Sequence, residues 1–494
     1  MGRFLETSKG KSLTENYEGE KAYQLTPEME LYTAVCTASL QPKFYIQTPE
    51  DELRRIRNLI SKVSPSFVSN LAIYAREKMY LRSIPLVLAI ELAKIHRGDN
   101  LVSSLVERII QRADEITELL GYYEISNERE DVKKLNKLSN QIKKGIKNSF
   151  SKFDEYQFAK YNRKSAITLK DAIFLTHPKE TELLKKIIED KLEIPYTWEV
   201  MLSEKGNKKE VWEELIDSKK VGYMATLRNL RNILQAGVSI KHLEKVSSYI
   251  ASKEAVEKSK QLPFRFLSAY RELKEVSSPY TSSILEALEG AIKHSSSNIK
   301  GFDLDTTVVI ACDMSGSMEN PLSERSKIKY FEIGLVLGML LQSKCKSVIS
   351  SIFGEDFKVV QLPRTNILSN ADGLARRIGE VGHSTNGYKT LDYLTNNRIK
   401  ADKIMIFTDL QMWDSNQNYY GYNDSSRTFQ SAWKDYKQIF PESKLYLFDL
   451  AGYGNTPLDV SNKDVSLIAG WSDKIFDCLS AIENGEKILN YISP

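Results

Sequence analysis

The sequence predicts a multidomain α plus α/β fold, in which a helical repeat part is followed by a doubly wound α/β part. Its 494 residues exceed the size at which a single hydrophobic core stops growing, roughly 250–300 residues. Over residues 28–298, apolar side chains recur at three- and four-residue steps, the period of an amphipathic helix. Beyond residue 300, β-branched apolar runs alternate with helical patterns. We therefore expect one domain at residues 1–299 and a second at residues 300–494.

The first half is expected to consist of paired helices joined by short loops. The apolar positions of residues 51–64 show the helical pattern: Leu53, Ile56, Leu59 and Ile60. Ser64 can cap a helix whose first position is Pro65, where the missing N–H has no cost. Gly121 can end another helix. Helix pairs over this length predict an α-solenoid, and its repeats must be degenerate because no strict sequence period is visible.

The second half is expected to contain a parallel sheet. Residues 306–313, TTVVIACD, are typical of a buried parallel strand. Further strand candidates are SVISSIFG, KIMIFTD and KLYLFDL, with helical segments such as FEIGLVLGMLLQSK between them. Alternating strands and helices predict an open doubly wound sheet, and such sheets bind ligands at the carboxyl ends of their strands.

The composition is that of an ordinary folded protein, with 41% hydrophobic and 27% charged residues. The four cysteines lie far apart and form no CxxC pair, which predicts reduced, mostly buried thiols rather than disulfides or a zinc ribbon. The N-terminal residues lack the apolar core of a signal peptide, and no apolar run is long enough to span a bilayer. We expect a soluble, cytoplasmic protein with no membrane partner.

The charge is unevenly divided. Residues 301–494 carry 20 Lys and Arg against 24 Asp and Glu, whereas residues 1–300 carry 49 against 41. The basic half is therefore the part expected to meet a polyanion, although the excess is modest for its length.

Asp313, Ser315 and Ser317 form a D-x-S-x-S motif directly after the first predicted strand. Asp409 ends the strand candidate KIMIFTD and would add a second carboxylate to the same sheet edge, and Thr385 could supply a further hydroxyl. Oxygen ligands of this kind suit a hard divalent cation, Mg²⁺ or Mn²⁺. The alternative is that the Asp and Ser residues only cap a helix and shape a turn.

Residues 133–152, KKLNKLSNQIKKGIKNSFSK, are the most basic segment. As an amphipathic helix they would bury Leu135, Leu138, Ile142 and Ile146 and offer ammonium groups on the other side. The lysines that we select as candidate RNA contacts are Lys143, Lys144 and Lys147. The alternative is a merely solvated lysine face, which is the usual role of such runs.

Residues 156–177 combine cations with aromatic rings. The cations are Lys160, Arg163, Lys164, Lys170 and His177, and the rings are Tyr156 and Tyr161. This mixture suits RNA, because phosphates need positive charge and unstacked bases need an aromatic surface. His177 could donate to a phosphate or stack on a base, or it could be held by a carbonyl at a helix C-terminus.

Taken together, these segments resemble the Ro autoantigen (TROVE-domain) family. The stretch GIKNSFSKFDEYQFAKYNRKSAITLKDAIFLTHPK is similar to the central TROVE signature. NYEGEKAYQLTPEMELYTAVCTA, RSIPLVLAIELAKI, GYMATLRNLRNIL, PFRFLSAYRELK and AGWSDKIFDCL resemble other family segments in the correct order, from about Asn16 to the C-terminus. Asp313, Ser315, Ser317, Thr385 and Asp409 resemble the metal-ion-dependent adhesion site of von Willebrand factor A domains.

The resemblance implies HEAT-like helical repeats closed into a ring and a Rossmann-like A-type domain that bridges the ring's ends. It also implies a monomeric ribonucleoprotein component in RNA quality control. Single-stranded 3′ ends of misfolded RNA would thread the ring, and Y-type small RNA would bind its basic outer surface. An exoribonuclease such as polynucleotide phosphorylase could be tethered through the RNA. Lys160, Lys164 and His177 fall on family positions that contact RNA, whereas the other basic residues are inferred from charge alone.

Two departures from the family patterns are visible. Family members often have Trp-[Ser/Thr]-His-[Lys/Arg]-Asp where this chain has residues 167–171, Ile-Thr-Leu-Lys-Asp, which places the details of Y-RNA recognition in doubt. The loop containing Thr385 starts His-Ser-Thr rather than with the common Gly-Thr, and Thr390 is a nearby alternative for the hydroxyl ligand.

Two other classes of function compete with RNA binding. A protein-interaction scaffold would use the metal to grip an acidic residue of a partner. An enzyme is not expected, since the sequence contains no P-loop, no HExxH and no Ser/His or Cys/His catalytic pattern.

Overall fold

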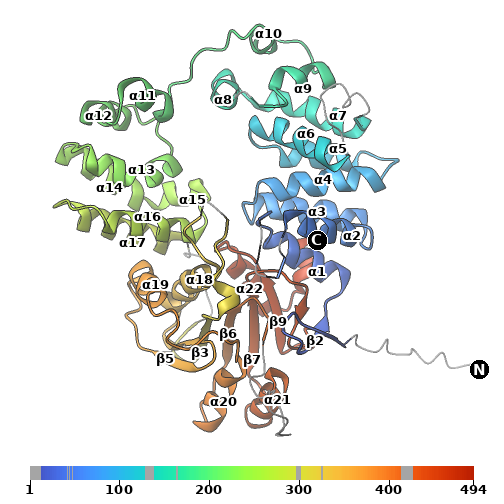
Figure 1. Cartoon of the computed structure of the whole chain (residues 1–494), viewed down its shortest axis with the longest axis vertical. Coiled ribbons are helices and arrows are strands. Elements are labelled where there is room, and N and C mark those ends of the chain that lie inside the picture. Colours follow the sequence, from blue (N-terminus) through green and yellow to red (C-terminus); the bar gives the residue numbers. More distant parts are fainter. Residues whose placement is uncertain are drawn as a thin grey trace, which may run out of the picture. The chain divides into compact units, whose positions relative to one another are not determined.

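The computed structural model describes residues 13–41, 43, 45–46, 48–127, 138–162, 165–295, 302–323, 326–412 and 427–493. The chain forms two compact units, drawn in Figure 1. The α/β unit comprises Met1–Glu52, Ile299–Thr365 and Ser369–Gly470. The helical unit comprises Leu53–Asn298, Asn366–Leu368 and Trp471–Pro494. Within the described ranges, no helix is both long and apolar enough to cross a bilayer.

This division is not linear along the chain. Met1–Glu52, expected among the helical repeats, groups with the α/β unit. The reason is backbone and side-chain pairing: strand β2 (Lys21–Gln24) adds to β8 (Asn455–Thr456), and the buried Lys43 ammonium donates to the Ala451 carbonyl at 2.8 Å.

The last residues of the chain were also expected in the second, α/β domain, and here too the structure differs. Trp471–Pro494 groups with the helical unit. There Cys478 of helix α22 (Ile475–Glu483) lies 2.8 Å from the hydroxyl of Tyr74, and Ser493 accepts a hydrogen bond from Asn70 at 2.8 Å. Helix α23 (Ile488–Ile492) packs on α3 (Pro65–Glu77).

A six-stranded sheet in the order β5-β4-β3-β6-β7-β9 forms the core of the α/β unit. Its strands are β3 (Thr307–Asp313), β4 (Ser347–Phe353), β5 (Phe357–Val360), β6 (Lys403–Thr408), β7 (Lys444–Asp449) and β9 (Val465–Ala469). All neighbours are parallel except β4 and β5, which are antiparallel. The chain leaves β3 toward β4 on one side and later returns to β6 on the other. The topological switch point, where such sheets bind ligands, therefore lies between β3 and β6.

Four helices lie between these strands along the chain. They are α18 (Tyr330–Lys344), α19 (Ile367–Ala375), α20 (Tyr388–Asn396) and α21 (Phe429–Ile439). Helix α18 packs on β3 and β6 and is buried from Tyr330 to Gln342, which explains its almost uniformly apolar sequence. The unit also includes α1 (Pro27–Cys36) and a small sheet of β1 (Leu13–Glu15), β2 and β8. The predicted doubly wound α/β fold is confirmed.

Successive packed helices build the helical unit, and the predicted repeat-like α fold is confirmed. The labels of Figure 1 mark α2 (Pro49–Ile60), α3, α4 (Ser83–Ile95), α5 (Leu101–Ile109), α6 (Asp114–Ser126), α7 (Asn140–Ser149), α8 (Glu155–Tyr161), α9 (Leu169–Thr176) and α10 (Glu182–Ile188). They continue with α11 (Trp198–Lys205), α12 (Lys209–Asp217), α13 (Tyr223–Gln235), α14 (Ile240–Ala251), α15 (Lys253–Ser259), α16 (Pro263–Lys274) and α17 (Thr281–Ser295). Closure of these helices into a ring stays a prediction.

One of the two predictions for helix ends in the helical unit is confirmed, and the other is wrong. The Ser64 hydroxyl accepts from the Phe67 N–H at 3.2 Å, with Pro65 at the first helical position, as predicted. Gly121 was expected to end a helix, and this was wrong, because α6 continues to Ser126. All four cysteines are buried and free, as expected.

Candidate nucleic-acid interface and metal site

Helix α7 presents the lysines of the most basic segment. Its Ile142 and Ile146 are fully buried, and Gly145 lets the helix lie directly on α5. With that face buried, Lys144 and Lys147 are exposed and Lys143 is half-buried, as the amphipathic pattern predicts. The Lys144 ammonium donates to Asn100 Oδ1 at 3.0 Å, so this lysine is held at the surface rather than free to move.

Helix α8 carries a cluster of cations and aromatic rings. The Lys160 ammonium lies 5.6 Å from the ring centroid of Tyr161 and 5.9 Å from that of Tyr156. The Arg112 guanidinium lies 4.4 Å from the Tyr161 ring centroid. Tyr156 is 41% exposed. We call Arg112, Tyr156, Lys160 and Tyr161 the cation–aromatic cluster.

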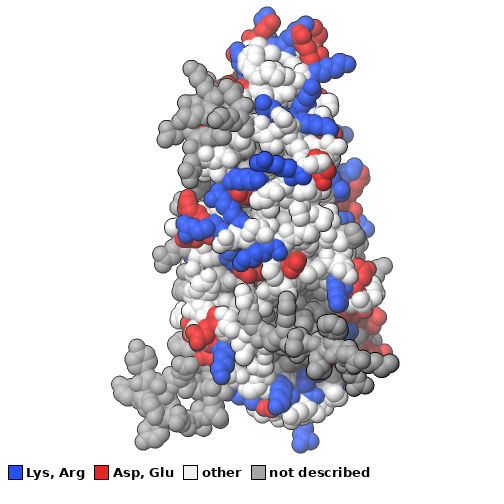
Figure 2. Space-filling view, turned by 90° about the vertical axis from the view of Figure 1, so that its right-hand side faces the viewer, with Lys and Arg blue, Asp and Glu red and all other residues white. Residues whose placement is uncertain are grey.

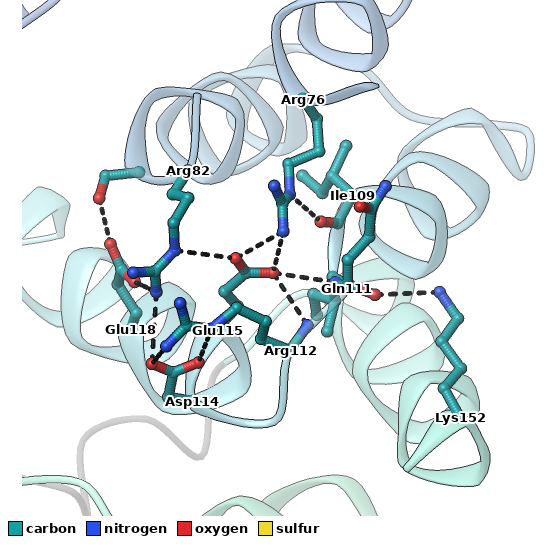
Figure 3. A network of polar contacts seen from close by, with 11 residues as sticks. Arg76, Arg82, Ile109, Gln111, Arg112, Asp114, Glu115, Glu118 and Lys152 are labelled. Atoms are coloured by element: carbon teal, nitrogen blue, oxygen red, sulfur yellow. Dashed lines mark hydrogen bonds and ion pairs between the residues drawn. The ribbon is translucent and has the colours of Figure 1, made fainter. Parts of the chain in front are cut away.

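A buried ionic network fixes the loop that carries Arg112 (Figure 3). The Glu115 carboxylate is fully buried and accepts from Arg76 at 2.7 and 3.1 Å. It also accepts from the backbone N–H groups of Gln111 and Arg112, at 2.9 and 3.1 Å. The Arg112 side chain is paired with Asp114 at 2.7 and 3.0 Å. The guanidinium is therefore held in one orientation before any ligand arrives, which lowers the entropic cost of using it.

Helix α9 continues the basic and aromatic surface. It begins with a capping box in which the side chains of Thr168 and Asp171 bond each other's backbone N–H. Lys170 donates to the Ile188 carbonyl at 2.6 Å, at the end of α10, so this candidate has a structural contact. Phe174 is 54% exposed. His177 caps the helix in the left-handed region at φ 47° and is exposed.

Six of the predicted RNA contacts lie in or at the end of helices α7, α8 and α9. Helix α9 packs on α6 and α7, and α8 follows α7 through a short 3-10 turn. The candidates in these helices are Lys143, Lys144, Lys147, Lys160, Lys170 and His177. Arg163 and Lys164 lie outside the described residues. Residues 167–171, where the chain departs from the family pattern, form the start of α9, with Ile167 and Leu169 in the core.

Sequence reasoning missed two residues of this surface, Arg112 and Phe174. Nothing local marks Arg112, because it lies in the loop between α5 and α6 and its partner Tyr161 lies on α8, far along the chain. In the sequence, Phe174 looks like an ordinary apolar position of a helix. It is exposed because of the way α9 packs. Figure 2 shows one face of the molecule on which several Lys and Arg side chains lie close together, with Asp and Glu side chains among them.

The metal-site candidates lie at the switch point of the α/β sheet. Asp313 is the last residue of β3, and Asp409 directly follows the neighbouring β6. Because Cys312 pairs with Phe407 in register, the two carboxylates leave the sheet from the same edge. The hydroxyls of Ser315 and Ser317 lie 3.3 Å apart in the loop after β3, and all these side chains are buried.

Burial and mutual repulsion govern the two carboxyl groups. Burial raises the pKa of Asp313 above its usual range, although hydrogen bonds from Ser315 and Thr408 oppose the shift. The pKa of Asp409 is raised by burial and further by the negative charge of Asp313. Asp409 Oδ2 is buried and finds no hydrogen-bond donor among the residues described. Two close, buried carboxyl groups with a free acceptor oxygen are the environment that a cation would stabilise.

Further polar residues hold this arrangement. The Thr408 hydroxyl donates to Asp313 Oδ2 at 2.6 Å and accepts from the Leu410 N–H at 3.1 Å. The Ser315 N–H donates to Asp313 Oδ1 at 2.9 Å, and the Gln411 N–H donates to Asp409 Oδ1 at 3.0 Å. Thr408 was missed at the sequence level, although its place beside Asp409 in the strand motif could have marked it.

The loop that contains Thr385 is hydrogen-bonded to the loop that follows β3. The Gly316 N–H donates to the His383 carbonyl at 2.8 Å, which brings the loop with Thr385 beside the D-x-S-x-S loop. Thr385 is buried, and so is Thr390, whose hydroxyl has no partner within the described part of the chain. Both candidates for the hydroxyl ligand therefore remain consistent with the geometry.

The donor set fits a hard cation and not a soft one. It consists of carboxylate and hydroxyl oxygens, the ligands that suit Mg²⁺ and Mn²⁺. The described ranges contain no group of three or more His, Cys, Asp and Glu side chains that could hold a metal ion.

A family model described as the TROVE domain matches residues 46–190 and 186–312, more than half of the chain. The chain is 26% identical over 365 residues to telomerase protein component 1 of Mus musculus, covering 55% of this chain and 14% of that protein. It is 26% identical over 349 residues to the same protein of Rattus norvegicus, covering 52% of this chain and 13% of that protein. The chain thus spans about one seventh of the length of these curated relatives.

One solved structure resembles the whole chain. The crystal structure of the RO (RSR) protein of Deinococcus radiodurans aligns with a TM-score of 0.59 at 15% sequence identity. The alignment covers 93% of this chain and 100% of that one. At this identity the likeness establishes the fold: a helical part joined to an α/β part is common to both chains.

Proposed function

Because this chain belongs to the TROVE-domain family, whose members are generally RNA-binding, we propose that it binds RNA through α7, α8 and α9 of its helical unit. The observation that carries the proposal is the cation–aromatic cluster, in which Lys160 and Arg112 flank the ring of Tyr161 and Tyr156 stays exposed. Such a cluster can meet a phosphate and an unstacked base at the same time. The exposed lysines of α7 extend the positive surface.

The expected ligands are a Y-type small RNA and the single-stranded 3′ ends of misfolded RNA. Support comes from the family membership and from the mixture of charge and aromatic surface, which suits single-stranded or splayed segments better than a regular A-form helix. In this role the chain is a non-catalytic, monomeric component of a cytoplasmic ribonucleoprotein in RNA quality control. An exoribonuclease such as polynucleotide phosphorylase would join it through the RNA.

The test is RNA binding across a salt series, using a hairpin RNA with a free single-stranded 3′ tail. The variant Lys147→Glu/Lys160→Glu/His177→Ala removes three described candidates without touching the hydrophobic core. We expect the wild type to bind, to weaken as salt rises, and to lose at least 100-fold in affinity in the variant, about 2.7 kcal/mol.

A control variant with the same change in net charge tests whether the loss of affinity comes from the predicted interface or from the overall charge. Lys208→Glu/Lys209→Glu makes the same two charge reversals at exposed positions at the start of α12. Acidic residues at a helix N-terminus do not destabilise it. Equal loss in both variants would mean a diffuse charge effect and would contradict the proposed interface. A wild type that binds no RNA would contradict the function itself.

For the α/β unit, we propose a divalent cation, Mg²⁺ or Mn²⁺, held by Asp313, Ser315, Ser317 and Asp409 with a hydroxyl from Thr385. The close buried carboxylates and the unpaired Asp409 Oδ2 support it. When bound, the cation supplies a positive charge that can accept one further acidic oxygen. The protein's own part is to hold the carboxylates at the sheet edge and to exclude water from them.

This donor set also supports a second candidate function, a metal-dependent protein-interaction scaffold without RNA. The two functions separate experimentally, because they use different units of the chain. Charge reversal at Lys147 and Lys160 would leave a metal-dependent partner bound, whereas Asp313→Ala would release it. RNA binding that survives Asp313→Ala but not the lysine reversals favours the first function.

A further inference from the structure

Helices α13 and α16 pack against each other in the helical unit and run in the same direction (Figure 1). Toward the start of both helices, the ring centroids of Tyr223 and Phe266 are 6.3 Å apart. Toward the end of both helices, the Arg231 guanidinium forms an ion pair with Glu272 at 2.6 Å. Because each contact joins like ends, the two helices are parallel and in contact along their length.

Two further arginines lie on the side of this helix pair where Arg231 meets Glu272. Arg228 is one turn before Arg231 on α13, and Arg265 is two turns before Glu272 on α16. Residues three or seven positions apart lie on the same side of a helix, so both arginines share the side of the ion pair. Both side chains are exposed. The two helices therefore present two cations at neighbouring surface positions.

These two cations have no counter-charge. Arg231 is neutralised by Glu272, whereas neither Arg228 nor Arg265 forms an ion pair or a hydrogen bond within the residues that the structure describes. The Arg265 guanidinium lies 5.4 Å from the ring centroid of the buried Phe264. This aromatic contact holds the Arg265 side chain against the helix surface without supplying a negative group.

The two positive charges act on each other. Partial withdrawal from water lowers the pKa of Arg265, and the positive charge of Arg228 lowers it further. An isolated exposed arginine is normally just solvated, but two like charges beside each other, one of them partly desolvated, cost free energy until an anion joins them. A guanidinium presents a planar fork of N–H donors that matches the oxygen atoms of a phosphate group.

We propose that Arg228 and Arg265 form a phosphate-binding pair on α13 and α16. The ligand is a phosphate group, supplied either by an RNA backbone or by free inorganic phosphate. Met224, one turn before Arg228, is 47% exposed, so apolar surface beside the cations is available to the sugar or base of a nucleotide. The pair lies on helices other than α7, α8 and α9 and goes beyond the proposed interface. Its occupation by RNA rests on the proposed function.

The first test is thermal unfolding of the full chain in inorganic phosphate and in chloride, at equal ionic strength and pH. A ligand that binds only the folded state raises the melting temperature. We expect phosphate to raise it in the wild type, and the rise to fall by at least about half in Arg228→Gln/Arg265→Gln. In chloride, Arg228→Gln should be at least as stable as the wild type, because the repulsion is relieved.

The matched control is Lys208→Gln/Lys209→Gln, which removes two exposed cations at the start of α12. Phosphate also stabilises proteins in general because it is excluded from their surfaces, and this contribution should be the same in all variants. The control should therefore respond to phosphate as the wild type does. An equal response of the arginine variant and the control would overturn the phosphate-binding pair.

RNA binding separates the two sources of the phosphate group. If RNA supplies it, Arg228→Gln/Arg265→Gln should weaken binding of a hairpin RNA with a single-stranded 3′ tail and reduce the salt slope by about 0.7 for each phosphate lost. If free phosphate is the ligand, the same variant should bind RNA as the wild type does while losing its response to phosphate.

Failure of this inference differs from failure of the proposed function. If substitution of Lys147, Lys160 and His177 abolishes RNA binding while the arginine variant changes neither RNA binding nor the response to phosphate, the function stands and the phosphate-binding pair is wrong. If the wild type binds no RNA but is stabilised by phosphate through the two arginines, the pair stands and the RNA function is wrong.

Discussion

Gly145 of α7 touches Val106 of α5 so closely that a Cβ atom at Gly145 would lie 2.6 Å from the Val106 Cβ. It would also lie 2.8 Å from the Ser103 carbonyl oxygen, which belongs to the backbone and cannot rotate away. This contact sets how α7 lies on α5, and so it sets which lysines of α7 face the solvent.

Gly145→Ala is therefore expected to destabilise the helical unit, despite the better helix propensity of alanine. Overpacking of this kind costs about 1–3 kcal/mol, and the propensity gain offsets up to about 1 kcal/mol. Urea unfolding followed by helical circular dichroism measures the difference. Gly121→Ala is the control, since a Cβ there meets nothing within 4 Å and should stabilise. A Gly145→Ala protein as stable as Gly121→Ala would contradict the tight crossing.

The buried pair Arg76–Glu115 should be far more important for stability than an exposed pair. Glu115→Ala leaves the buried Arg76 guanidinium without its carboxylate, which costs about 3–5 kcal/mol. Glu77→Ala removes the partner of Arg108 at the surface, which costs under about 1 kcal/mol. Denaturant unfolding of the two variants checks the contrast. Similar losses would mean that the network of Figure 3 is not desolvated in solution.

Substitution of Tyr156 should show the contribution of aromatic stacking to RNA binding separately from the contribution of charge. Tyr156→Ala removes an exposed ring beside Lys160 and should weaken binding of a single-stranded RNA by about 1–3 kcal/mol. The slope of log affinity against log salt should not change, because no cation is lost. Fluorescence anisotropy with a short labelled RNA at several salt concentrations measures both quantities.

Lys147→Ala should instead change the salt dependence of RNA binding. Loss of one phosphate contact reduces the salt slope by about 0.7 for a single strand. A weakened affinity with an unchanged slope would place Lys147 outside the interface, as a solvated lysine only.

The buried carboxyl of Asp473 predicts a pH dependence of stability. Burial raises the pKa of Asp473 to about 6, partly opposed by Lys474. The unfolded chain ionises this group first, so the folded state loses stability as the pH rises from about 4 to about 6. Asp473→Asn should therefore raise the free energy of unfolding by about 1–3 kcal/mol at pH 7 and by almost nothing at pH 4. A gain of equal size at both pH values would contradict this assignment.

The sequence by itself determined the two classes of secondary structure and their order along the chain. Period-three-and-four apolar patterns specified the helices, and short apolar runs specified β3, β4, β6 and β7, because each element must bury its apolar side chains. It also placed Asp313 and Asp409 at strand ends. Parallel strands share one carboxyl edge, so convergence of these two residues followed from the pattern alone.

Only the tertiary structure decided which distant residues complete each site. The hydrogen bond between Thr408 and Asp313 joins residues 95 positions apart, and Arg112 meets Tyr161 from the loop between α5 and α6. Strand β2 pairs with β8, and Met1–Glu52 groups with the α/β unit. Such contacts depend on helix crossings and strand pairing between remote segments, and local periodicity carries no information about them.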